Sequence, residues 1–150
     1  MVGAIIDGHK ERYKECDPSP LLNGRNEMKV HFSSITDNWA TPKDVYDELN
    51  KEFNFDFDPC PIGGENGLDV QWVGRTYVNP PYSQLKAWCK KAYEESLKGK
   101  LVVMLIPSRT DTIAWHEYVM KAKEIRFIKG RLKFGGSKNS APFPSCVVVF

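Results

Sequence analysis

The spacing of hydrophobic residues changes several times along the chain, and each spacing predicts a type of secondary structure. Apolar positions three or four residues apart predict amphipathic helices over about 42–53, 84–98 and 112–122. Alternating or continuous apolar runs predict strands at 55–58, 76–78, 101–106, 124–128 and 146–150. The run at 101–106 is apolar at every position, which is typical of a central parallel strand buried on both faces.

Helices and strands alternate in this pattern, so it predicts an α/β fold. We expect a compact, mainly parallel sheet with a C-terminal antiparallel strand, flanked by helices, within one domain over 31–150. Residues 1–30 are weakly patterned and contain turn-forming pairs such as Asn23-Gly24. They are predicted to form a flexible N-terminal arm.

The first predicted helix has a clear start signal. Thr41 can cap the helix with its hydroxyl, Pro42 suits the first helical position, and Asp44 can complete a capping box. The sequence therefore predicts that the side chain of Thr41 serves this helix end.

Charge is unevenly distributed, although the formal net charge is only +2. Residues 121–138 hold seven basic residues and one acidic residue, which leaves the remainder of the chain acidic. A local basic stripe of this kind favours phosphate binding, with a solvated strand face as the alternative. The residues of this stripe expected to contact nucleic-acid phosphates are Arg126, Lys129, Arg131 and Lys133.

Cysteine usage and hydropathy exclude several classes of protein. Four cysteines, at 16, 60, 89 and 146, show no Cys-x-x-Cys spacing, so we expect reduced thiols and no metal site. No apolar run is long enough to cross a membrane, and no secretory leader is evident. A cytoplasmic location is the expectation.

The tetrapeptide Asn79-Pro80-Pro81-Tyr82 follows a predicted strand and carries the most specific chemistry. The exocyclic amine of adenine is a poor nucleophile, because its lone pair is delocalised into the ring. Acceptors for the amine hydrogens, here the Asn79 side-chain oxygen and the Pro80 carbonyl, localise that lone pair on nitrogen. Both prolines stiffen the turn, and Tyr82 offers a face for stacking an extruded base. The alternative is an ordinary rigid turn or a proline-rich ligand of another domain.

Five blocks in order resemble the phage-type, Dam-like DNA N6-adenine methyltransferases, and the region they mark covers about four-fifths of the chain. The blocks are Trp39-Ala40-Thr41-Pro42, Phe57-Asp58-Pro59-Cys60, Asn79-Pro80-Pro81-Tyr82-Ser83, the stretch from Leu105 to Thr112 with Trp115-His116, and the stretch from Phe127 to Phe134. The resemblance implies a Rossmann-like sheet, bound S-adenosylmethionine, and methyl transfer to adenine N6 in double-stranded DNA.

The resemblance also implies roles for individual residues. Residues 79–82 correspond to the adenine-amine site. Thr41 and Pro42 correspond to the motif near the methionine end of the donor, and Asp58 with Pro59 to the end of the first cofactor strand. An acid in the position of Asp58 can bind the ammonium group of the donor.

Three departures from larger methyltransferases concern the donor and the DNA target. No Gly-x-Gly loop follows Asp58, and only about twenty residues separate Asp58 from Asn79. The spacing therefore does not fix which acid holds the ribose of the donor, and the candidates are Asp69 and Glu65. No separate target-recognition domain is evident, so DNA specificity would come from the basic segment, the N-terminal arm or a second copy in a homodimer.

Arg109 follows the buried strand at the same predicted sheet edge as Asn79, and it could hold a phosphate or pair with Asp111. Two other functions remain open at this point. An Asn-Pro-Pro-Tyr site also suits methylation of RNA bases or of glutamine side-chain amides. A catalytically inactive DNA-binding module of the same fold is the other alternative.

Overall fold

The computed structural model describes residues 39–61 and 66–150, so the predicted arm over 1–30 lies outside the described residues. The helices are α1 (Lys43–Phe53), α2 (Leu85–Leu97) and α3 (Ile113–Glu117), with short 3-10 turns η1 (Tyr82–Gln84), η2 (Val119–Lys121) and η3 (Phe134–Gly136). The strands are β1 (Arg75–Val78), β2 (Leu101–Pro107), β3 (Glu124–Phe127) and β4 (Ser145–Val149).

The sheet confirms the α/β class but corrects the expected pairing. Its strand order is β1-β2-β4-β3, and only β1 and β2 pair in parallel. The C-terminal strand β4 is antiparallel, as predicted, but it lies between β2 and β3 and pairs with both. The prediction of a mainly parallel sheet is therefore wrong, because one inserted strand makes two of the three strand pairs antiparallel.

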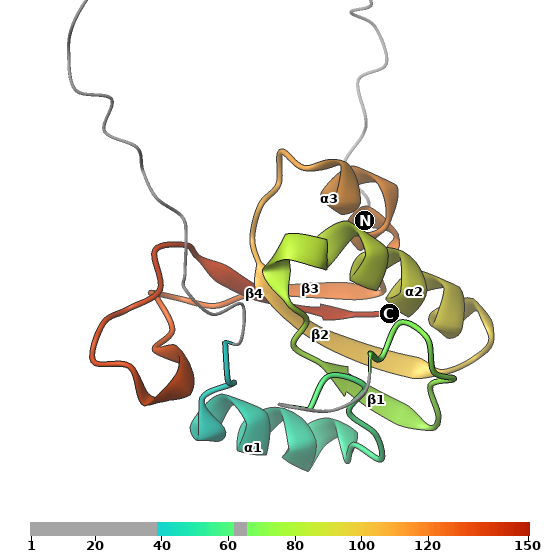
Figure 1. The fold of residues 1–150 in the computed structure, drawn as a ribbon, viewed down its shortest axis with the longest axis horizontal. Helices are drawn as coiled ribbons and strands as arrows, with labels where there is room; N and C mark the ends of the chain where they lie inside the picture. The colour runs from blue at the N-terminus through green and yellow to red at the C-terminus, as the bar shows by residue number, and fades with distance from the viewer. Residues whose placement is uncertain (1–38, 62–65) are drawn as a thin grey trace, which may run out of the picture. The chain divides into compact units, whose positions relative to one another are not determined.

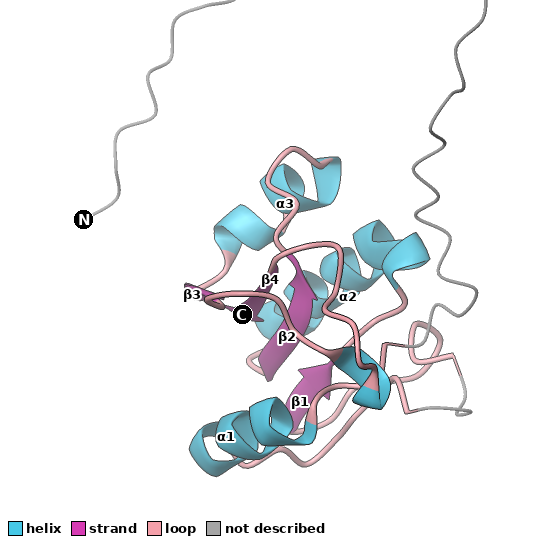
Figure 2. Ribbon diagram, turned by 90° about the vertical axis from the view of Figure 1, so that its left-hand side faces the viewer, coloured by secondary structure: helices cyan, strands magenta, loops and turns pink. Residues whose placement is uncertain are grey.

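Helices cover both faces of the sheet (Figures 1 and 2). Along β2, Val102, Met104 and Ile106 face the core that contains α2 and α3, whereas Val103 and Leu105 face the core that contains α1. All five of these side chains are fully buried. β2 is thus the doubly buried central strand that its continuous apolar run predicts.

Two predicted local features differ in the structure. The segment 55–58 is not a full strand and joins the sheet by a single parallel bridge between Phe57 and Thr76. The predicted helix over 112–122 ends at Glu117, because Tyr118 leaves the helical conformation, and η2 follows.

The predicted cap of the first helix is also wrong. Pro42 occupies the N-cap position of α1, and no side chain caps this end of the helix. The hydroxyl of Thr41 is directed instead to Tyr77 and Asn79. A tertiary contact has therefore replaced the local one.

Cys89 and Cys146 are buried thiols without a disulfide, and Cys60 is partly exposed. Within residues 39–61 and 66–150, no helix has the length and apolarity needed to cross a membrane.

Candidate active site

Two chain segments end side by side at one edge of the sheet. The Phe57 carbonyl accepts from the Tyr77 backbone N–H at 2.9 Å, so Asp58 and Asn79 leave the sheet next to each other. A bidentate ion pair anchors the same segments, since the Arg75 guanidinium contacts both Asp56 carboxylate oxygens at 3.0 and 3.1 Å. The carboxyl ends of neighbouring parallel segments are where α/β folds place their ligands.

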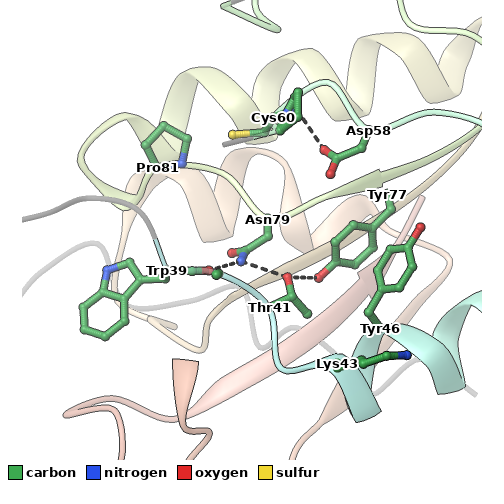
Figure 3. A pocket seen from close by; sticks show the side chains of 11 residues that line it. Trp39, Thr41, Lys43, Tyr46, Asp58, Cys60, Tyr77, Asn79 and Pro81 are labelled. Carbon is green, nitrogen blue, oxygen red and sulfur yellow. Dashed lines mark hydrogen bonds between the residues drawn. The ribbon is translucent and has the colours of Figure 1, made fainter. Parts of the chain in front are cut away.

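A pocket of about 330 Å³ opens at this edge (Figure 3). It is lined by residues from α1, from the segment that precedes it, and from the two strand ends: Trp39, Ala40, Thr41, Lys43, Tyr46, Asp58, Cys60, Pro61, Tyr77, Asn79 and Pro81. The pocket thus brings together three residues that the sequence marks separately, namely Thr41, Asp58 and Asn79.

The side-chain amide of Asn79 is held in one orientation. Its nitrogen donates to the Trp39 backbone carbonyl and, at 3.0 Å, to the Thr41 hydroxyl (Figure 3). Its oxygen accepts from the Tyr82 hydroxyl at 3.2 Å. Since a carbonyl oxygen has two lone pairs, the Asn79 oxygen can accept a second hydrogen bond.

Behind Asn79, the Thr41 hydroxyl lies 2.7 Å from the Tyr77 hydroxyl. Tyr77 is only 2% exposed. Burial raises the pKa of the Tyr77 phenol far above its ordinary value, an effect that the hydrogen bond with Thr41 only partly offsets. Tyr77 therefore stays protonated and neutral at physiological pH.

An aromatic cluster that the sequence did not indicate surrounds Tyr82. The rings of Trp39 and Tyr82 are nearly parallel, with centroids 6.3 Å apart. Phe143 packs edge-on against both at 5.3–5.4 Å, and Phe134 packs against Trp39 at 5.5 Å. Trp39 and Phe134 each stood in one of the five sequence blocks, but both Phe134 and Phe143 lie in a glycine- and proline-rich segment without periodicity. No sequence pattern places these two phenylalanines here.

Asp58 offers the pocket its carboxylate. The Asp58 side chain is accessible to solvent, but neighbouring atoms exclude part of the water around its carboxyl group and so raise its pKa. A 2.8 Å hydrogen bond from the Cys60 backbone N–H opposes that rise. A neighbouring cation would favour the charged form and lower this pKa again.

The other residues assigned to the donor lie outside the pocket lining. Pro59 is buried, and its backbone contacts Gly67 so closely that a Cβ at Gly67 would lie 2.0 Å from the Pro59 oxygen. Asp69 is exposed and accepts from the Asn66 side-chain amide at 2.8 Å. Pro42 ends the segment that leads into α1. The pocket thus collects Thr41 and Asp58, but not Asp69. Glu65 lies outside the described residues.

The basic residues divide into two groups. Arg126 is engaged by two carboxylates, with contacts of 2.6 Å to Glu52 and 2.8 Å to Glu124. Its guanidinium also lies over the Phe53 ring at 5.3 Å. Lys129, Arg131 and Lys133 are exposed on the segment that follows β3, and Arg109 is exposed after β2.

The segment with the exposed basic residues continues directly into the pocket wall. Phe134 and Phe143 join it to the aromatic cluster, and the Gly135 N–H donates to the Ala40 carbonyl at 2.8 Å. The segment that carries these exposed positive charges therefore also supports the wall of the Asn79 pocket.

Comparison with known proteins gives a consistent result. The family model described as DNA N-6-adenine-methyltransferase (Dam) matches residues 30–146. A DNA N-6-adenine-methyltransferase of Haemophilus phage HP1 (strain HP1c1) is 35% identical over 110 residues, which cover 63% of this chain and 64% of the relative. One of Escherichia phage T1 is 24% identical over 144 residues, which cover 86% of this chain and 60% of the relative. The chain thus spans somewhat less than two thirds of each relative, and no solved structure matches it.

Proposed function

The chain belongs to the DNA N-6-adenine-methyltransferase family, and from this premise and the geometry of its pocket we propose that it transfers a methyl group to the N6 amine of adenine in DNA. The observation that carries the proposal is the orientation of the Asn79 amide. Its two N–H groups face Trp39 and Thr41, and its oxygen, which accepts one hydrogen bond from Tyr82, keeps a second lone pair for a substrate amine.

Asn79 would act on the amine without removing a proton beforehand. The Asn79 oxygen and the Pro80 carbonyl accept the two amine hydrogens, so that electron density shifts to the nitrogen. As the new N–C bond forms and the S–C bond of the donor breaks, positive charge develops on that nitrogen. The Asn79 oxygen, which the hydrogen bonds of its amide already orient, would stabilise this charge, and one amine proton would then leave to solvent. Tyr82 offers an aromatic face in the same loop for a base rotated out of the duplex.

S-adenosylmethionine is the proposed methyl donor, and its sulfonium supplies a methyl group that is electrophilic enough for direct transfer. Asp58 suits the donor's ammonium group, because its carboxylate lines the pocket and a neighbouring cation would lower the pKa that its surroundings raise. Pro42 and Pro59 would shape the two segments that carry Thr41 and Asp58. Asp69 would reach the ribose from outside the pocket.

We infer that the sheet is a shortened Rossmann-like methyltransferase sheet. β1 and β2 run in parallel, and β3 shares their direction, since both β2 and β3 are antiparallel to β4. The pocket opens at the carboxyl ends of β1 and the Phe57 segment, which is the position expected for a ligand in such a sheet.

The direct test is transfer of a labelled methyl group from S-adenosylmethionine to unmethylated double-stranded plasmid DNA, followed by digestion to nucleosides and mass detection. We expect N6-methyladenine as the product. Label in RNA or in glutamine amides, with none in DNA, would replace the proposal with one of those substrates. Donor binding without any transfer would favour the inactive DNA-binding module.

Double-stranded DNA is proposed to lie along Lys129, Arg131 and Lys133, with Arg109 as a further phosphate contact. Arg126 would first have to exchange its two carboxylate partners for phosphates. Neutralising Lys129 and Lys133 to glutamine should weaken DNA binding at all sequences. A plot of log K against log salt has a negative slope. The magnitude of this slope should decrease by about 2, because each lost phosphate contact removes about 0.9 from it.

This change is measured by fluorescence anisotropy with a labelled duplex at several salt concentrations. Lys51→Gln and Lys90→Gln, made together, remove two exposed lysines from α1 and α2 and provide the matched control. If the magnitude of the slope decreases equally in the Lys129/Lys133 variant and in the Lys51/Lys90 control, the DNA surface is not the segment that follows β3.

A further inference from the structure

We propose that the Thr41 hydroxyl and the Trp39 backbone carbonyl are positioning groups that lock the Asn79 amide with its oxygen toward the substrate. The inference rests on the proposed function and adds a role for Thr41 beyond the donor site. It concerns the rate of methyl transfer and not the affinity for either substrate.

An asparagine amide can rotate by 180° and exchange its oxygen and nitrogen, and only one of the two arrangements suits the reaction. The Trp39 carbonyl is a pure acceptor, so it binds the Asn79 nitrogen and would repel the Asn79 oxygen. A backbone group therefore decides which way the amide faces.

The Thr41 hydroxyl oxygen accepts a hydrogen bond from the second N–H of Asn79 at 3.0 Å. A hydroxyl can donate as well as accept, so Thr41 alone could not select the amide orientation. Its contribution is to complete the pair of acceptors. With both N–H groups engaged, a partial rotation of the amide would break two hydrogen bonds in a partly buried site, and a full exchange of oxygen and nitrogen would break the one to the Trp39 carbonyl.

Tyr77 holds Thr41 in place from the core. Its ring lies on β1, two residues before Asn79, and packs edge-on against Tyr46 of α1 at 5.1 Å. Its hydroxyl reaches Thr41 at 2.7 Å, so the strand that presents Asn79 also fixes the group that orients it. The hydrogen-bonded chain therefore runs from Tyr77 through Thr41 to the reactive amide.

The test is Thr41→Val, which keeps the side-chain shape and removes the hydroxyl. We expect kcat to fall by about tenfold, the effect of roughly one hydrogen bond in the transition state, with the donor Kd and the KM for DNA within about twofold of wild type. Thr41→Ser, which restores the hydroxyl, should recover most of kcat. Thr76→Val removes another hydroxyl, one that donates to the Val73 carbonyl at 3.2 Å, and should leave kcat near wild type.

A second readout does not depend on activity. In protein labelled with ¹⁵N-asparagine, the Asn79 side-chain resonances are assigned from their disappearance in Asn79→Asp. In Thr41→Val we expect one of the two Asn79 amide protons to move upfield and to exchange with water about tenfold faster.

The outcomes separate the explanations. A higher donor Kd with unchanged kcat would assign Thr41 to donor binding alone and overturn the proposal, as would unchanged Asn79 resonances in Thr41→Val. If the wild-type protein transfers no methyl group, the proposed function fails. The resonances then decide by themselves whether Thr41 holds the amide.

Discussion

Asn79→Ala is expected to lower kcat for methyl transfer by a factor of about 10²–10³, the usual result of deleting one preorganised hydrogen-bonding group that acts in the transition state. The substitution removes the oxygen proposed to accept from the amine. It leaves the Pro80 carbonyl, the Tyr82 ring and Asp58 in place, so donor binding should change little. Single-turnover transfer and calorimetric titration of the donor measure the two quantities separately.

Asn79→Asp is the matched control, because it keeps an acceptor oxygen and removes both N–H groups. One carboxylate oxygen would then face the Trp39 carbonyl and repel it, so kcat should fall between the values for wild type and Asn79→Ala. Full activity in Asn79→Ala would remove the central claim about the site. Equal loss in kcat and in donor affinity would show that Asn79 maintains the structure of the pocket and does not act on the substrate amine.

Glu95→Ala is expected to destabilise the fold by roughly 3 kcal/mol, near the lower end of the effect of breaking a buried ion pair. The Glu95 side chain is 1% exposed and contacts Lys100 at 2.5 Å and Lys98 at 2.8 Å. Lys100 also donates to the Trp72 backbone carbonyl, so the cluster ties α2 to the segment before β1. Removing the carboxylate would leave Lys100 confined without its partner, and Tm should fall by about 6–12 °C.

Glu95 also predicts a pH dependence of stability. Burial alone would raise the pKa of its carboxyl group, but hydrogen bonds from Lys100 and Lys98 hold it at about 2. Because the folded-state pKa is below the ordinary value of 4.5, the stabilisation is complete above about pH 5 and is lost as the pH falls toward 2. Urea unfolding between pH 2 and 7 should show this loss in wild type and less of it in Glu95→Ala.

Glu94→Ala provides the control for Glu95, since Glu94 is the adjacent residue in α2 but is 51% exposed and 3.8 Å from Lys90. Its replacement should change the free energy of unfolding by less than about 0.5 kcal/mol. Equal destabilisation by the two variants would show that burial of the Glu95 cluster does not matter.

Much of the candidate site could be predicted from the sequence, because its main residues follow strand ends. Asn79 follows one predicted strand and Asp58 ends another, and parallel segments bring such positions to one edge. The groups around Asn79 could not be predicted in the same way. Trp39 contacts Asn79 through its backbone carbonyl, which any residue type could provide. In the sequence, Tyr77 has the pattern of an ordinary buried strand residue.

Thr41 shows how a local rule can fail for a physical reason. The sequence Thr-Pro-x-Asp favours a helix cap, but the hydroxyl oxygen can accept only two hydrogen bonds and has a limited reach. In the folded chain that hydroxyl is hydrogen-bonded to Tyr77 and Asn79, and Pro42 occupies the N-cap position. A cap depends on residues a few positions away, whereas this contact joins residues 36 and 38 positions apart.

The sequence by itself determined the local elements of this protein, because a helical or strand periodicity is a property of neighbouring residues. It determined the central buried strand β2, the helices α1 and α2 to within a few residues, and the stiff loop that carries Asn79 and Tyr82. Only the tertiary structure decided that β4 lies between β2 and β3, that Glu52 and Glu124 engage Arg126, and that Phe134 and Phe143 enclose Tyr82. Each of these depends on which distant segments meet, and strand order and ion pairing are set by packing across the whole domain and not by spacing along the chain.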